Sequence, residues 1–276
     1  MDWSQLLTPL FLTQLLAAGV TLATPLALAA LGEVFAERSG SLNLGLEGIM
    51  LFSGFIGFNA AYHIGNLWIG ILGAVMMGSI MGLLFAFMTI TLQANQTVTG
   101  LAINFLGNGL APYFYRLVFK VTLDTPRVEP FQNVPIPVLS DIPFIGDILF
   151  NHSVFTYLMF LLVAVTFVII YKTPFGLRLN AVGESPQTAD TLGVNVGRIR
   201  YICVVIGGAL AGMAGAFYSL VELGSYSDSM INGRGFIASA LVIFGRWDPV
   251  WTFGGALLFG LIDAFQNRLQ VLGSPI

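Results

Sequence analysis

The chain has 276 residues, of which 56% are hydrophobic and only 9% are charged, and its formal net charge is −3. Soluble domains carry roughly 25% charged residues, so this composition excludes an ordinary soluble surface. Without a block of basic residues, the sequence gives no support to nucleic-acid binding. Length alone would suggest two soluble domains, but the apolar content predicts one transmembrane domain over residues 1–276.

The first apolar segment has no charged residue between Trp3 and Gly32, and Asp2 stands where a signal peptide would carry positive charge. This uncharged stretch is much longer than the apolar region of a signal peptide. We therefore predict a retained membrane span and not a cleaved leader.

Hydropathy separates eight apolar segments, and a span needs about 20 apolar residues. They cover residues 6–31, 48–64, 67–92, 98–118, 153–171, 200–221, 235–245 and 250–268. The pattern predicts an all-α, polytopic transmembrane helical bundle with about eight spans. The seventh segment is too short to cross alone, so it is either tilted or continued by the polar residues before it.

Small residues recur at a spacing of four in two of these segments. Gly78 and Gly82 form one pair, and Gly208, Gly212 and Ala216 repeat the pattern. Such spacing lets two helix backbones approach closely in lipid. The alternative is that glycine is simply frequent in membrane helices.

Two long polar connections differ in charge. Residues 119–152 hold five prolines and four acidic residues, whereas residues 172–199 hold Lys172, Arg178 and Arg198. Positive charge beside spans marks the cytoplasmic side. We predict a cytoplasmic loop at 172–199, an outer loop at 119–152 and, by alternation, an N-terminus outside.

A short helix is predicted inside the basic connection. Ser185 suits the N-cap, Pro186 suits the first helical position, and Gly193 supplies a left-handed stop. Such a helix is too short to be stable alone, so it needs a surface to lie on. Ala189 and Leu192 would form its small apolar face. The alternative is an ordinary ordered loop.

Several kinds of chemistry lack their residues. The sequence contains no Gly-x-x-x-x-Gly-Lys-Ser/Thr phosphate loop and no Gly-x-Ser-x-Gly nucleophile motif. Two histidines and one cysteine make a metal site or a disulfide unexpected. We therefore predict a protein that is not an enzyme and has no cofactor of its own.

Four polar residues lie inside or beside apolar segments: Asn43, Glu47, Asn104 and Asn108. Polar groups in spans normally face a pathway or a partner, so we predict that these residues line a solute path. The alternative is that the amides form hydrogen bonds between helices. The stretches 42–55 and 231–245 also resemble each other as Asn- and Gly-rich entries into a helix, as in transporters with interrupted helices.

Charged residues near the ends of spans suggest two further contacts. Glu37 and Arg38 are expected to form a local ion pair or to contact an ATPase at the inner mouth. Glu222 and Asp228 lie near the predicted outer mouth, where they could receive a solute-binding protein.

Three stretches carry a resemblance to a known family. They are "AVGESPQTADTLGVNVGRIRYICVVIGGALAGMAGAF" (181–217), "FAERSGSLNLGLEGIM" (35–50) and "GRGFIASALVIFGRWDPVWTFGGALLFGLIDAF" (233–265). The chain resembles permease subunits of ABC importers for branched-chain amino acids, simple sugars and nucleosides, with type II permease-like architecture. The stretch 35–50 is most similar to the nucleoside branch.

The resemblance implies a short cytoplasmic helix that docks on a separate ATP-binding subunit. It assigns this coupling role to Gly183, Glu184, Ser185, Pro186, Leu192 and Gly193. It also implies a final span that this sequence lacks.

The implied protein is the membrane-spanning subunit of an ATP-driven importer, multi-pass in the cell (inner) membrane, which carries a nucleoside-like or simple-sugar solute. Its partners would be the ATP-binding subunit, a second permease subunit, an extracytoplasmic solute-binding protein and the lipid bilayer. The alternatives are a branched-chain amino acid permease and a secondary transporter that needs no ATPase.

Overall fold

A computed structural model describes residues 9–120, 125–137, 139–140 and 142–271 of the chain. Within the described residues every predicted apolar segment forms a helix, and residues 6–8 of the first segment lie outside the described part. These helices are α1 (Pro9–Arg38), α2 (Leu46–Ile64), α3 (Leu67–Ala86), α4 (Gln96–Phe119), α6 (Val154–Lys172), α9 (Val196–Phe217), α10 (Arg234–Phe244) and α11 (Pro249–Val271). Short π-helical turns at Phe87–Thr91 and Tyr218–Glu222 continue α3 and α9.

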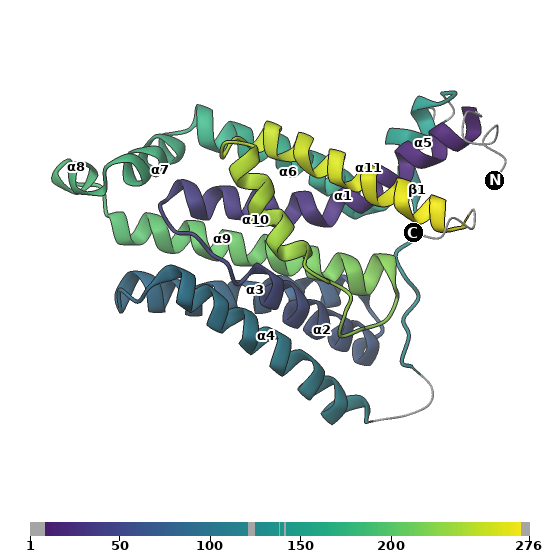
Figure 1. Cartoon of the computed structure of the whole chain (residues 1–276), viewed down its shortest axis with the longest axis horizontal. Coiled ribbons are helices and arrows are strands. Elements are labelled where there is room, and N and C mark those ends of the chain that lie inside the picture. Colours follow the sequence, from purple (N-terminus) through teal and green to yellow (C-terminus); the bar gives the residue numbers. More distant parts are fainter. Residues whose placement is uncertain (1–8, 121–124, 138, 141, 272–276) are drawn as a thin grey trace.

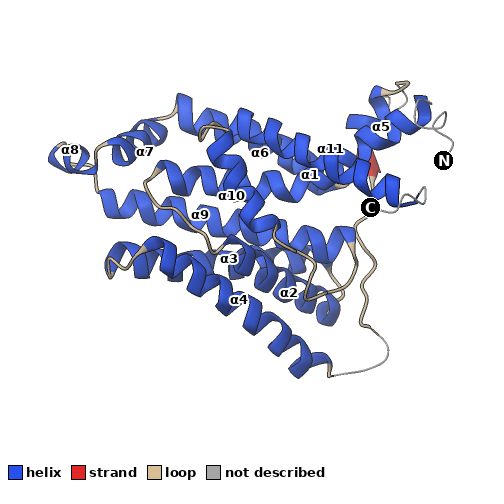
Figure 2. Cartoon of the chain, viewed as in Figure 1, coloured by secondary structure: helices blue, strands red, loops and turns tan. Residues whose placement is uncertain are grey.

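The remaining elements lie at the two ends of the bundle. The helix α5 (Ile145–Leu149) and the strands β1 (Val134–Pro135) and β2 (Asn151–His152) form a small cap at one end. The two strands pair antiparallel, and Figure 2 shows how little strand the described chain contains. Two helices, α7 (Pro174–Glu184) and α8 (Pro186–Thr191), project at the opposite end (Figure 1).

The number of complete spans stays a prediction. Four described helices are long and apolar enough to cross a membrane: Phe11–Arg38, Leu67–Thr91, Val154–Lys172 and Val196–Glu222. The helix α10 has 11 residues. At 1.5 Å per residue it covers about 16 Å, roughly half of a bilayer core. The polar residues before it form turns and not helix, so they do not extend it.

The helices α2 and α10 start inside the bundle and run in opposite directions. The carboxylate of Glu47, in the first turn of α2, bonds the backbone at the start of α10. From there α2 leads toward the end where Trp68 contacts Phe131, with ring centroids 5.3 Å apart. The helix α10 leads to the turn where Trp247 contacts Arg38. The two similar entries in the sequence are therefore two helices that begin inside the bundle after non-helical segments and meet at their N-termini.

The predicted small-residue contact exists between α3 and α9. A Cβ atom added to Gly78 would lie 2.2 Å from the Gly208 carbonyl oxygen, and one added to Gly212 would lie 2.4 Å from that of Ala74. A Cβ atom cannot approach a backbone atom so closely, so only glycine permits this packing. Close backbone contact without long side chains is a main source of helix association in lipid.

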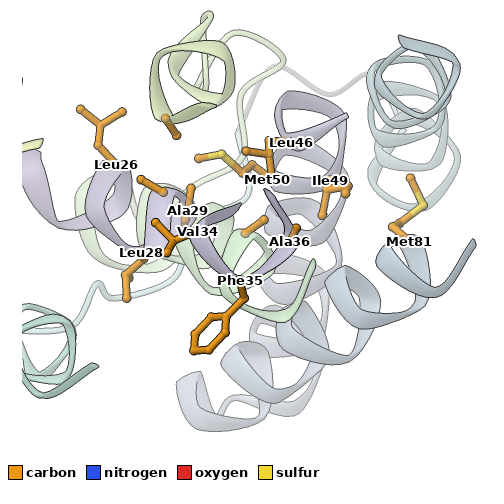
Figure 3. Packing of buried hydrophobic residues seen from close by; sticks show 14 of the residues in the cluster. Leu26, Leu28, Ala29, Val34, Phe35, Ala36, Leu46, Ile49, Met50 and Met81 are labelled. Atoms are coloured by element: carbon orange, nitrogen blue, oxygen red, sulfur yellow. The ribbon is translucent and has the colours of Figure 1, made fainter. Parts of the chain in front are cut away.

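The core is built mainly by α1 with α2, α3, α9 and α10 around it. Residues such as Leu28 and Leu31 of α1 and Ile49 of α2 are fully buried. Figure 3 shows side chains of α1, α2 and α3 gathered in this one cluster. A rigid α1 thereby connects the interior of the bundle to its end at Arg38.

Candidate coupling segment and polar positions

The basic connection at 172–199 folds as two helices. Thr173 caps α7, since its hydroxyl accepts a hydrogen bond from the N–H of Gly176 (3.3 Å), and Pro174 occupies the first helical position. The sequence analysis missed α7, although Thr followed by Pro is a helix-start signal. The buried side chains of Leu179 and Val182 attach α7 to the core.

The predicted short helix is α8, and its ends lie where the sequence placed them. It follows Ser185, begins at Pro186 and stops before Gly193, which has a left-handed φ of +81°. The Ser185 hydroxyl, however, bonds the hydroxyl of Thr188 (2.8 Å) and caps no backbone N–H. Helix position was therefore predicted correctly, but the side-chain cap was not.

Of the two residues predicted to form the apolar face of α8, only Ala189 packs against the rest of the chain. Ala189 is 2% exposed and packs on the core, whereas Leu192 is 78% exposed. Leu192 follows the last helical residue, where the chain turns toward Gly193, so its side chain leaves the face that Ala189 occupies. The structure thus presents a large apolar side chain to the surroundings at this end of the bundle.

The end of α7 lies against the end of α1. A Cβ atom on Gly183 would lie 2.0 Å from the carbonyl oxygen of Arg38, so this position requires glycine. Glu184 is exposed. A cavity of about 500 Å³ opens beside this contact, and its lining includes Gly183, Glu184, Arg38 and Trp247.

The expected ion pair between Glu37 and Arg38 does not form in the described part of the chain. The Glu37 carboxylate accepts a hydrogen bond from the indole N–H of Trp247 (2.5 Å). The Arg38 guanidinium donates to the amide oxygen of Asn180 (3.0 Å), the hydroxyl of Tyr171 (2.6 Å) and the carbonyl of Trp247 (2.8 Å). An arginine offers five donors in a rigid plane, so it satisfies three separate acceptors better than it pairs one adjacent acid.

The turn between α10 and α11 extends this network. Asp248 accepts hydrogen bonds from the Tyr171 hydroxyl (2.7 Å) and from the backbone N–H groups of Val250 (2.9 Å) and Trp251 (3.1 Å). Burial raises the pKa of Asp248, but these hydrogen bonds and nearby Arg38 outweigh burial and hold the pKa below its usual value. The carboxylate therefore stays ionised and caps α11. The dipeptide Asp-Pro before an apolar run is a helix-start signal that could have located this cap.

Glu47 lies where the starts of α2 and α10 meet. Its two carboxylate oxygens accept hydrogen bonds from the N–H of Gly233 (2.7 Å) and of Gly235 (2.8 Å). The N-terminus of a helix favours negative charge, since its first N–H groups have no partner within the helix. A Cβ atom on Gly235 would lie 2.4 Å from the Glu47 backbone nitrogen. The carboxylate thus holds the start of α10 against the start of α2.

Asn43 organises the irregular segment that leads into α2. It is 1% exposed, and its side-chain oxygen accepts a hydrogen bond from the N–H of Gly45 (2.9 Å). Its own backbone N–H donates to the buried carboxylate of Glu33 (2.8 Å). Asn43 and Glu47 therefore shape the backbone at the middle of the bundle.

The two amides of α4 bond each other along one helix. The Asn108 side chain donates to the side-chain oxygen of Asn104 (2.6 Å) and to its carbonyl (2.9 Å). Asn104 is 8% exposed and lies where Gly48 of α2 touches α4, whereas Asn108 is exposed. Within one subunit the hydrogen bonds between these two amides therefore stay inside α4, and both the solute path and hydrogen bonds between helices remain predictions.

A second charged group in the bundle was missed from the sequence. Arg234 forms an ion pair with Asp263 of α11 (3.6 Å), and its guanidinium lies 5.1 Å from the centroid of the Tyr218 ring. Both charged side chains are partly buried. The signal that could have identified this contact is a charge directly before the segment 235–245, at Arg234, and a charge inside the segment 250–268, at Asp263.

These features define a polytopic helical membrane protein with two helices that start against each other inside the bundle and a separate helical segment at one end. Comparison with known proteins gives its family. The chain belongs to the family described as branched-chain amino acid transport system / permease component, whose model matches residues 15–274.

Several curated relatives cover most of the chain. It is 39% identical over 270 residues to the guanosine ABC transporter permease protein NupQ of Bacillus subtilis. The aligned region covers 95% of this chain and 83% of that protein. Identity is 40% over 266 residues to the putative glucose ABC transporter permease protein TsgC13 of Haloferax volcanii (95% and 79%).

A third relative is the nucleoside ABC transporter permease protein NupC of Lactococcus lactis, at 37% identity over 261 residues (92% of this chain and 80% of that protein). No solved structure matches the chain. The chain is therefore an ABC transporter permease, which is a transport subunit and not an enzyme. It is a multi-pass protein of the cell membrane.

Proposed function

We propose that this permease passes a nucleoside-like or simple-sugar solute into the cytoplasm. Support comes from relatives at 37–40% identity that are named for guanosine, nucleosides and glucose. The nucleoside-like stretch 35–50 contains Asn43 and Glu47, which shape the middle of the bundle. A branched-chain amino acid is the second candidate, because the family description names that class.

The partner that supplies energy is a separate ATP-binding subunit, which docks on α8 and on the last residues of α7, over residues 183–193. The observation that carries this proposal is the projection of these helices beyond the bundle, with Leu192 exposed at 78% (Figure 1). The coupling residues are Gly183, Glu184, Ser185, Pro186, Leu192 and Gly193. A second permease subunit and an external solute-binding protein complete the importer. The binding protein docks at the end of the bundle where Glu222 and Asp228 lie.

The solute path runs along Asn104 and Asn108 of α4. Asn108 is exposed in the single subunit, so its side-chain oxygen can accept a hydrogen bond from a solute or from the second subunit while its N–H₂ bonds Asn104. The side-chain oxygens of Asn43 and Glu47 already accept hydrogen bonds from backbone N–H groups. These two residues therefore contribute to the path by fixing the backbone that lines it. Importers need weak contacts along the path, so none of these residues acts as a tight anchor.

Reconstitution tests the proposed function. With the ATP-binding subunit and binding protein present, proteoliposomes are expected to accumulate tritiated guanosine only when ATP is supplied. Replacing Asn104 and Asn108 with leucine should slow this uptake while the binding protein keeps its affinity, since leucine has a similar volume and no amide. Accumulation without ATP would instead indicate a secondary transporter. Uptake of labelled leucine and not of guanosine or glucose would reject the proposed solute class.

A further inference from the structure

Arg38 is placed to join elements that surround it at one end of the bundle. It is near the last turn of α1, and its hydrogen bonds reach α6 through Tyr171, α7 through Asn180, and the α10–α11 turn through Trp247. Its guanidinium also lies 4.9 Å from the centroid of the Tyr171 ring. Tyr171 in turn donates to Asp248, the N-terminal cap of α11. A single side chain thus connects the segment that carries α8 to four helices of the bundle.

A cavity separates α7 from the α10–α11 turn, and Arg38 connects the two across it. The cavity of about 500 Å³ lies between Asn180, Glu184 and Trp247, so side-chain packing there is incomplete. Among the described residues, Asn180 makes the one side-chain hydrogen bond from α7 to the rest of the bundle. The backbone of Arg38 also contacts Gly183 without space for a side chain. A movement of α7 therefore displaces Arg38.

The geometry points to Arg38 as a positioning residue that transmits movement between the α7–α8 segment and the bundle during transport. This inference rests on the proposed function, because it assumes that an ATP-binding subunit moves α8. A planar guanidinium fixes the directions of its donors, so it keeps three acceptors in one mutual arrangement. A lysine ammonium carries the same charge but cannot reproduce the fixed, planar arrangement of the guanidinium donors. Coupling between sites requires such an element shared by both.

The test separates coupling from folding. The complex is reconstituted with its ATP-binding subunit, and ATP hydrolysis is measured with and without the external binding protein purified with its natural solute. Asn180→Ala removes the side-chain hydrogen bond from Arg38 to α7 and leaves the backbone contact with Gly183, so basal hydrolysis should persist while stimulation by the binding protein falls about fivefold or more. Arg38→Lys should reduce stimulation in the same way. Asn180→Asp retains an acceptor for the guanidinium and should restore stimulation.

Arg246→Gln is the matched control. Arg246 lines the same cavity, and among the described residues its side chain makes no hydrogen bond or ion pair. Stimulation in this variant should equal that of the parent. Parent-like stimulation in both Asn180→Ala and Arg38→Lys would overturn the role of Arg38. Failure of the parent chain to bind the ATP-binding subunit would overturn the proposed function, and this inference with it.

Discussion

Replacing Glu47 with alanine is expected to lower the stability of the folded chain by about 3 kcal/mol or more, because two hydrogen bonds to a charged acceptor are lost. The N–H groups of Gly233 and Gly235 would then be buried without a partner at the start of α10. Glutamine keeps one acceptor oxygen but turns an amide N–H₂ toward the second donor. We therefore expect Glu47→Gln to be intermediate.

Thermal unfolding of the detergent-solubilised protein, followed by size-exclusion chromatography, measures this effect. Glu129→Ala is the control, because Glu129 is exposed in the 119–152 connection and its loss should leave the unfolding temperature unchanged. If Glu47→Ala unfolds at the parent temperature, the carboxylate does not hold α2 and α10 together.

Replacing Leu192 with glutamate is expected to abolish most binding of the ATP-binding subunit while the permease itself folds normally. Leu192 is 78% exposed, so its own chain loses little packing when it is replaced. Burial of a leucine side chain at an interface is worth about 1.5–3 kcal/mol, and a buried carboxylate without a partner would add a further cost. Binding should therefore weaken by about tenfold or more.

Co-purification from membranes measures that binding. The matched control is Leu139→Glu, since Leu139 is 40% exposed in the 119–152 connection and lies away from α8. Equal recovery of the ATP-binding subunit with the Leu192 variant and the Leu139 variant would show that the partner does not use the exposed end of α8.

The sequence predicted best what depends on local pattern. Within the described residues, each apolar run coincides with a helix. The small residues around Gly78 and Gly212 indicated that helix backbones approach closely, but the sequence did not show that α3 and α9 are the pair. The left-handed stop at Gly193 was also evident, since few other residues tolerate that conformation.

The sequence predicted least what depends on partners distant in the chain. Arg38 was expected to pair with its neighbour Glu37, but its acceptors come from residues 133 to 209 positions away. Glu47 was assigned to the solute path, yet its carboxylate bonds a helix start 186 residues later. A buried polar residue signals that it has a partner, but periodicity does not identify which one.

The orientation of α7 and α8 tests the central claim most directly, because an ATP-binding subunit can act only from the cytoplasm. Single cysteines are introduced at Gln187 in α8 and at Gln132 in the outer connection, both exposed positions, and intact cells are treated with a membrane-impermeant thiol reagent. The native Cys203 is buried and should contribute little background. We predict labelling at position 132 and none at position 187 until the cells are opened. Labelling at position 187 and not at position 132 in intact cells would contradict the account.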